Sequence, residues 1–99
     1  DPSVLVDGDT VYLYTGHDAS TDEQVANSVY EIPEYLCYSS TDLVNWKSEG
    51  TVMTMDTVDW AKDDVSAWAS QVMKYNDKYY LYYCSWDKSG KQSIGVART

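Results

Sequence analysis

Thr10-Val11-Tyr12-Leu13-Tyr14-Thr15 is the stretch that decides the fold, because every residue in it favours a β-strand. It follows the tight-turn signal Asp7-Gly8-Asp9, which in turn follows a short apolar run at residues 3–6. An Asp-Gly turn between two such runs is typical of a β-hairpin. The chain is therefore expected to begin with a pair of antiparallel strands.

The same pattern returns near the other end of the chain. Tyr80-Leu81-Tyr82 repeats Tyr12-Leu13-Tyr14 at an offset of 68 residues, and the same offset aligns Val4 with Val72. In each copy a strand, a turn, a tyrosine-rich strand, a loop and a strand of small residues follow in order. Repeated antiparallel units of about four strands are typical of β-propeller blades.

The repeat predicts an all-β fold made of four-stranded antiparallel sheets, the blades of a β-propeller. A first blade covers about residues 1–55, and an incomplete second blade covers about residues 66–99. Residues 16–30 and 53–66 are polar and mixed, and we expect loops there. The strands are expected at residues 3–6, 10–15, 35–40, 46–52, 68–75, 78–84 and 92–97.

A helix is the alternative at the start of the second blade. Val65, Trp68, Ala69 and Val72 lie at the i, i+3, i+4 and i+7 spacing of one helical face. The turn signal at Asn76-Asp77 favours the strand. In either case two blades leave faces uncovered and edges unpaired, so we expect either part of a larger propeller or a chain that self-associates.

Acidic residues outnumber basic ones in this chain of 99 residues, with 16 Asp and Glu against 7 Lys and Arg and a formal net charge of −9. This charge excludes nucleic acid and an anionic membrane surface as partners, because clusters of Lys and Arg are what bind phosphate. No apolar run approaches the roughly 20 residues that span a bilayer. A neutral ligand remains compatible with the charge.

The aromatic residues point toward a sugar ligand. The chain has 10 Tyr and 4 Trp but no Phe. Tyr and Trp combine an apolar face with a hydrogen-bonding tip, which suits an amphipathic ligand such as a sugar. The alternative is that the tyrosines serve only as good strand formers.

Cys37 and Cys84 each lie in a tyrosine-rich apolar run. We expect buried free thiols, with a single disulfide as the alternative. Neither cysteine has a His or a second Cys at the spacing of zinc ligands. No metal and no other cofactor is therefore expected.

Six segments of the chain together resemble glycoside hydrolase family 43, and they extend over nearly all of it. They are Asp1-Pro2-Ser3-Val4, residues 12–18, Ser39-Ser40-Thr41-Asp42-Leu43-Val44-Asn45-Trp46, Trp68-Ala69-Ser70-Gln71-Val72, residues 78–83 and Ile94-Gly95-Val96-Ala97. The resemblance implies the first two blades of a five-bladed propeller. The chain departs from the family at Ser70, where the family often has Pro.

The resemblance also implies an activity. Members of the family are arabinanases, arabinofuranosidases and xylosidases that act on plant cell-wall polysaccharides with inversion at the anomeric carbon. They use a carboxylate base, a carboxylic acid and a third carboxylate that tunes the acid. Asp1 matches the base, whereas the segments that carry the other two groups belong to later blades. The family also implies a secreted or periplasmic location.

Four further residues are candidates for contacting the sugar. Trp68 matches the tryptophan that stacks on the sugar ring in the family, and its alternative role is in the core. His17 and Asp18 follow a strand where a loop reaches the rim of the site, with solvated loop residues as the alternative. Trp86 is expected to wall a subsite or to pack at the edge of its strand. Structural roles are expected for Trp46, in its outer strand, and for Asp63 and Asp64, in a solvated turn.

The sequence therefore predicts part of an inverting glycoside hydrolase for arabinose- or xylose-containing glycans, inactive as a chain of 99 residues because it lacks an acid partner for Asp1. The alternative is a non-catalytic module of two blades that binds glycan or self-assembles through its exposed blade edges. A third possibility is an unrelated small β-domain whose aromatic residues all belong to the core.

Overall fold

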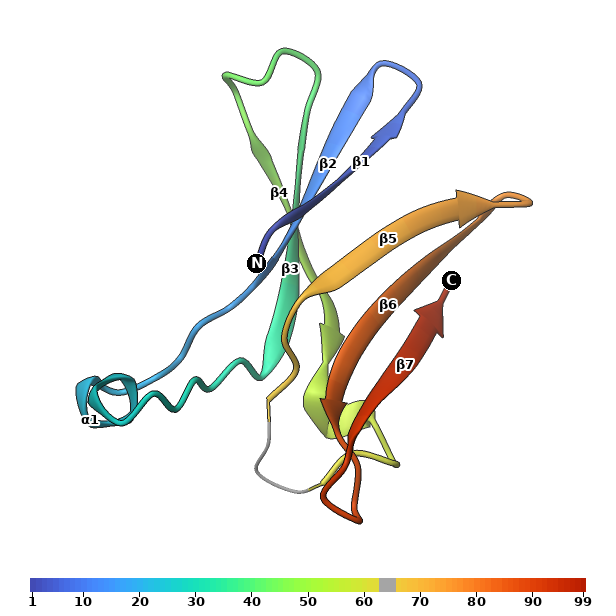
Figure 1. Cartoon of the computed structure of the whole chain (residues 1–99). Helices are drawn as coiled ribbons and strands as arrows, with labels where there is room; N and C mark the ends of the chain where they lie inside the picture. Colours follow the sequence, from blue (N-terminus) through green and yellow to red (C-terminus); the bar gives the residue numbers. More distant parts are fainter. Residues whose placement is uncertain (63–65) are drawn as a thin grey trace.

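The computed structural model describes residues 1–62 and 66–99, and it contains two antiparallel sheets (Figure 1). The strand predictions are confirmed in number and order, with shifts at several ends. The first sheet contains β1 (Ser3–Asp7), β2 (Thr10–Gly16), β3 (Glu34–Ser40) and β4 (Lys47–Thr54). The second sheet contains β5 (Ser70–Tyr75), β6 (Lys78–Trp86) and β7 (Gln92–Arg98).

Each sheet is a meander, in which strands that are neighbours in sequence are also neighbours in space. The odd-numbered strands therefore all begin at one end of their sheet and finish at the other end. We call these two rows of strand ends the loop edge and the turn edge, in that order. The β5–β6 hairpin turns through Asn76 and Asp77, with φ of 48° and 63°. Two positive φ values in a two-residue loop match the twist of the strands, and Asn and Asp tolerate them.

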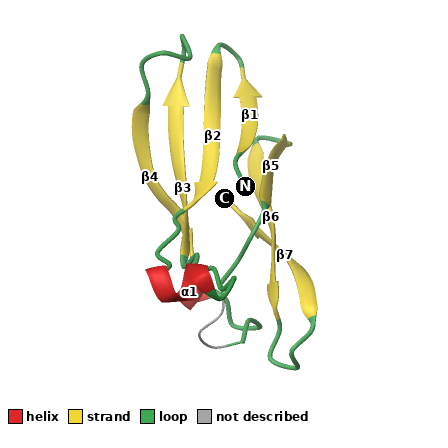
Figure 2. Ribbon diagram, turned by 60° about the vertical axis from the view of Figure 1, so that its left-hand side comes forward, coloured by secondary structure: helices red, strands yellow, loops and turns green. Residues whose placement is uncertain are grey.

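The two sheets pack face to face, with β1 beside β5 (Figure 2). Val72 and Leu81 of the second sheet lie in the same core as Tyr14 and Cys37 of the first. Tyr35, at the start of β3, is only 1% exposed. Burial of the apolar surface of these side chains, which contributes a free energy of roughly 25 cal/mol per Å², holds the sheets together.

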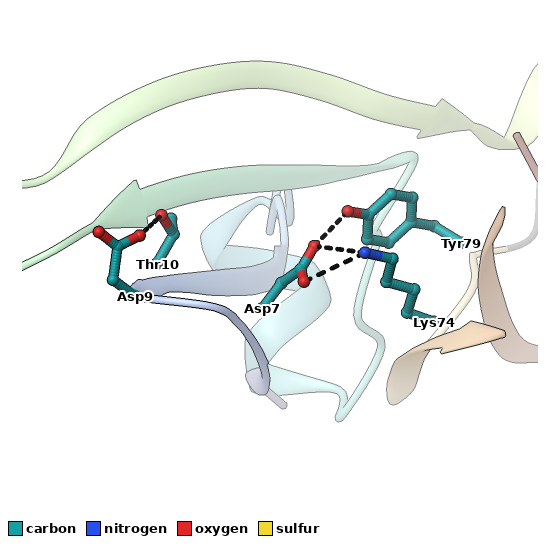
Figure 3. A network of polar contacts seen from close by, with 5 residues as sticks. All are labelled: Asp7, Asp9, Thr10, Lys74 and Tyr79. Atoms are coloured by element: carbon teal, nitrogen blue, oxygen red, sulfur yellow. Dashed lines mark hydrogen bonds and ion pairs between the residues drawn. The ribbon is translucent and has the colours of Figure 1, made fainter. Parts of the chain in front are cut away.

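A polar cluster joins the sheets at the turn edge (Figure 3). Lys74 Nζ lies 3.2 Å from Asp7 Oδ1 and 3.3 Å from Asp7 Oδ2. The Tyr79 hydroxyl donates to Asp7 Oδ2, and the Lys74 ammonium lies 5.7 Å from the centre of the Tyr79 ring. The end of β1 is thereby tied to the end of β5.

The prediction that residues 16–30 form only a loop is wrong, because the short helix α1 occupies Asp22–Ala26. Thr21 and Gln24 form a reciprocal capping box, in which each side chain accepts from the other residue's backbone N–H. None of the residues of α1 is buried. Because α1 buries no side chain, its sequence carries no apolar stripe that would indicate a helix. The capping box was the one sequence signal for it.

The strand expected at residues 68–75 begins two residues later than predicted. Trp68 and Ala69 precede β5, and the backbone N–H of Trp68 bonds to the carbonyl of Cys84 at 3.1 Å. Because Ser70–Tyr75 is a strand, the helical alternative is excluded from residue 70 onward. Val65, which is part of the helical alternative, lies outside the described residues. The same is true of Asp63 and Asp64, for which the sequence predicts a solvated turn. In the described part of the predicted loop of residues 53–66, a 3-10 turn is found at Met55–Thr57.

Both cysteines are free thiols, as expected, but only Cys37 is buried, because Cys84 is half-buried. Trp46 precedes β4 and is 41% exposed. The turn before it is held by Asp42, whose Oδ1 accepts from the backbone N–H groups of Val44 and Asn45 at 2.9 and 2.8 Å. These bonds hold the pKa of Asp42 well below its usual range. The acidic residue of this motif therefore has a structural role.

Candidate functional site

All the predicted site residues lie at the loop edge of their own sheets. Asp1 precedes β1, and His17 and Asp18 follow β2. Trp68 precedes β5, and Trp86 is the last residue of β6. Because alternate strands run in opposite directions, these positions share one edge.

The loop edges of the two sheets lie at the same end of the molecule. The backbone N–H of Ile32, before β3, donates to Ser66 Oγ at 2.6 Å. The Tyr35 hydroxyl donates to the backbone carbonyl of Trp68. These bonds join the start of β3 to the segment that enters β5, while the contact between Asp7 and Lys74 joins the opposite ends.

Asp1 and Trp68 are separated along the chain by the same number of residues from the ion pair between Asp7 and Lys74. Asp1 is six residues before Asp7, and Trp68 is six residues before Lys74. The strands between them, β1 and β5, lie side by side (Figure 2). The side chain of Asp1 is exposed.

Trp68 and Trp86 are brought together in a corner. Their ring centres lie 6.2 Å apart and their planes cross at 84°. They form one wall of a recess of about 540 Å³, and the opposite wall comes from the segment between β2 and β3. The lining residues are Gln24, Ser28, Val29, Tyr30, Glu31, Ser66, Trp68 and Trp86.

The segment that forms the opposite wall is fastened at several points. Gln24 Nε2 donates to Glu31 Oε2 at 3.2 Å, and the backbone N–H of Glu31 donates to Ser20 Oγ at 2.7 Å. Tyr30 is 49% exposed. Gln24, Tyr30 and Glu31 are not among the residues predicted from the sequence. The capping signal at Gln24 and a lone Tyr in a polar stretch were the available clues.

His17 and Asp18 are not among the described residues that line this recess. His17 Nδ1 lies 2.7 Å from Glu34 Oε1, and Thr51 Oγ1 donates to Glu34 Oε2 at 3.2 Å. Asp18 bonds within its own loop, where hydrogen bonds from Ser20 lower the pKa of its carboxyl. The structure therefore fixes His17 through Glu34 and gives Asp18 a local role.

Two negative observations complete the description of the site. In residues 1–62 and 66–99, no group of three or more His, Cys, Asp or Glu side chains is arranged to hold a metal ion. In the same part of the chain, no helix has the length and apolar character needed to cross a membrane.

The two meander sheets therefore form an all-β scaffold, and its candidate ligand site is an aromatic recess at the loop edge. The sequence matches the family model described as glycosyl hydrolases family 43 along residues 1–99. The chain belongs to this family, so the resemblance drawn from the sequence motifs is confirmed.

Relatives with described activities are similar along nearly the whole chain. The xylosidase/arabinosidase 43A of Humicola insolens is 33% identical over 103 residues, which cover 98% of this chain and 31% of that protein. The extracellular endo-alpha-(1->5)-L-arabinanase of Thermotoga petrophila is 29% identical over 112 residues, covering 98% of this chain and 20% of that protein.

Solved structures give the same result. A beta-xylosidase/alpha-arabinofuranosidase from a compost microbial metagenome, in complex with xylotriose, superimposes with a TM-score of 0.85 at 29% identity, covering 100% of this chain and 30% of the other. An alpha-L-arabinofuranosidase from Clostridium thermocellum gives a TM-score of 0.75 at 36% identity, with the same coverages. The chain thus spans about a third or less of the length of these relatives.

Proposed function

We propose that this chain supplies two blades of a five-bladed propeller to an inverting glycoside hydrolase that acts on arabinose- or xylose-containing glycans. One observation carries the proposal. The Trp68–Trp86 corner lies at the same edge as Asp1, where neighbouring strands of the two sheets begin. The apolar face of a sugar ring packs on an indole, while its hydroxyls face polar groups.

Asp1 is the general base in this proposal. An inverting enzyme activates water with one carboxylate and protonates the leaving group with another, and the two are roughly 6.5–9.5 Å apart. Their environments hold the two pKa values apart, so that one group is ionised while the other is protonated. Because Asp1 fills only one of these roles, the isolated chain is proposed to be inactive.

The sheet repeat supports further blades. At the offset of 68 residues, Tyr14 corresponds to Tyr82. Tyr14 is buried in the core shared by the two sheets, whereas Tyr82 is 42% exposed on the opposite face of the second sheet from Leu81. Val96, which pairs with Tyr82, is 54% exposed. This face fits the contact that a further sheet makes in a propeller.

Two measurements on the chain test the proposal. We expect no turnover of nitrophenyl arabinofuranoside or nitrophenyl xyloside, and robust turnover by the isolated chain would contradict the assignment of an incomplete catalytic set. We expect xylotriose to bind and to change the tryptophan fluorescence. Trp68→Ala should abolish this binding, whereas the matched control Trp46→Ala should keep it.

The non-catalytic alternative has its own supporting observation. Ile94 is 80% exposed on the uncovered face of the second sheet. A second copy of the chain could cover this face. Light scattering after size-exclusion chromatography distinguishes the two functions, because a defined oligomer that binds xylotriose favours a self-assembling glycan-binding module. A monomer favours part of an enzyme.

A further inference from the structure

The wall of the recess that faces the tryptophans carries polar groups as well as an aromatic ring. Gln24 lies within α1 and Glu31 lies three residues before β3, and both line the recess. Their side chains are joined by the 3.2 Å bond from Gln24 Nε2 to Glu31 Oε2. Tyr30, next to Glu31, lines the same wall.

The hydrogen bonds that Gln24 and Glu31 already make determine which of their donor and acceptor groups remain free for a ligand. Gln24 Oε1 accepts from the backbone N–H of Thr21 at 2.7 Å, which fixes the orientation of the amide. After the bond to Glu31, the amide nitrogen keeps one more hydrogen to donate, and the carboxylate keeps Oε1 as an acceptor. The pair therefore presents a donor and an ionised acceptor side by side.

A donor next to an acceptor matches two neighbouring hydroxyls of a sugar, since each hydroxyl both donates and accepts. Anionic ligands are disfavoured here by Glu31 and by the net charge of −9. The other lining residues are aromatic, serine or valine. A neutral pentose residue fits this combination of groups, and the volume of about 540 Å³ lies within the usual range of ligand sites.

We propose that Gln24 and Glu31 hydrogen-bond two neighbouring hydroxyls of a pentose residue seated between Tyr30 and the Trp68–Trp86 corner. The segment between β2 and β3 is then the wall that determines specificity. This inference rests on the proposed glycan-binding function, and it assigns recognition to residues outside the family motifs found in the sequence.

The capping box makes the segment rigid enough for this task. Thr21 and Gln24 fix the start of α1, and Ser20 holds the backbone of Glu31. The same Gln24 amide therefore closes the helix and faces the recess. A preorganised pair binds a ligand without ordering a loop, which avoids the entropy loss of that step.

The test uses xylotriose and an α-1,5-linked arabinotriose as probes, with affinity measured by tryptophan fluorescence. Glu31→Gln keeps an acceptor for Gln24 but removes the charge, so we expect affinity to fall about tenfold for the better probe. The matched control Glu23→Gln removes the same charge from α1 outside the recess and should leave affinity unchanged. Circular dichroism serves to check that each variant is folded.

A second pair of variants tests the ring. Tyr30→Ala should weaken binding by about fivefold to tenfold through loss of stacking, whereas Tyr30→Phe should retain most of the affinity. Wild-type affinity in both Glu31→Gln and Tyr30→Ala, together with loss in Trp68→Ala, would overturn the inference and leave the proposed function standing. Absence of binding by the unmodified chain would overturn both.

Discussion

Asp7 and Lys74 form an ion pair that bridges the two sheets, at the edge opposite the recess. Each residue is the fifth in a stretch that begins with a buried serine, Ser3 in β1 and Ser70 in β5. β1 and β5 therefore run side by side, and this contact joins their ends at the turn edge. The pair fixes the alignment of the strands whose opposite ends enter the candidate site.

The ion pair predicts an acid-sensitive contribution to stability. Hydrogen bonds from Tyr79 and Lys74 lower the pKa of Asp7, so its contribution is present above the usual carboxyl range and is lost as the pH falls through the lowered pKa. Thermal unfolding of the unmodified chain and Asp7→Asn should differ most near neutral pH and converge in strong acid. Asp9→Asn, in the same turn, is the control.

The same pair predicts loss of stability in alkali. The Asp7 carboxylate raises the pKa of Lys74, so the contribution of Lys74 is complete below the usual lysine range and is lost only as the pH rises through the raised value. Lys74→Met should therefore have its largest effect on the melting temperature near neutral pH. An effect of the same size at both pH extremes would contradict the electrostatic origin.

Ser70→Ala is expected to be neutral or stabilising. In the described part of the chain, Ser70 Oγ is buried without a hydrogen-bond partner, so its removal relieves a desolvation penalty of about 1–3 kcal/mol. Ser85→Ala is the opposite case, because the fully buried Ser85 hydroxyl donates to the carbonyl of Ser66 at 2.9 Å. Urea unfolding should give a lower free energy of unfolding for Ser85→Ala and an unchanged or higher one for Ser70→Ala.

Gly95→Ala is expected to destabilise the second sheet by about 1–3 kcal/mol. An added Cβ would lie 2.5 Å from Tyr83 Cζ and 2.6 Å from Trp60 Cζ2. These rings stack with centres 5.9 Å apart, so neither gives way without breaking the stack. Ile94→Thr, at the exposed neighbouring position, should leave the free energy of unfolding nearly unchanged. Equal stability of the two variants would contradict this.

Asp1→Asn tests the proposed catalytic assignment in a polypeptide that carries these residues together with the further blades proposed above. Loss of the general base should lower kcat by about 10²–10⁴-fold with little change in KM. Asp9→Asn, at the turn edge, should leave both parameters unchanged. Full activity in the Asp1 variant would remove Asp1 from the mechanism.

The strands could be predicted from the sequence because their signal is local. Tyr12, Leu13 and Tyr14 favour a strand by themselves, and the flanking Asp-Gly turn sets the pairing. The offset of 68 residues also identified equivalent positions in the two sheets. What the repeat could not predict is where β5 begins, because Trp68 bonds to Cys84 outside the ladder of hydrogen bonds.

Of the candidate recess, only the corner formed by Trp68 and Trp86 could be predicted. Trp68 and Trp86 follow strand signals and a family motif, so their position at one edge was accessible. Gln24 and Glu31 are seven residues apart in a polar segment, and they meet because α1 and the bond to Ser20 fold that segment back on itself. A contact of this kind leaves no periodic pattern in the sequence.

The separation of the two edges has a practical consequence. The ion pair between Asp7 and Lys74 lies at the end with the tight turns, and the recess lies at the other end. A combinatorial library that randomises positions on the recess wall, such as 28–31, would therefore leave this ion pair intact. Selection from such a library could redirect this scaffold toward other saccharides without redesigning its framework.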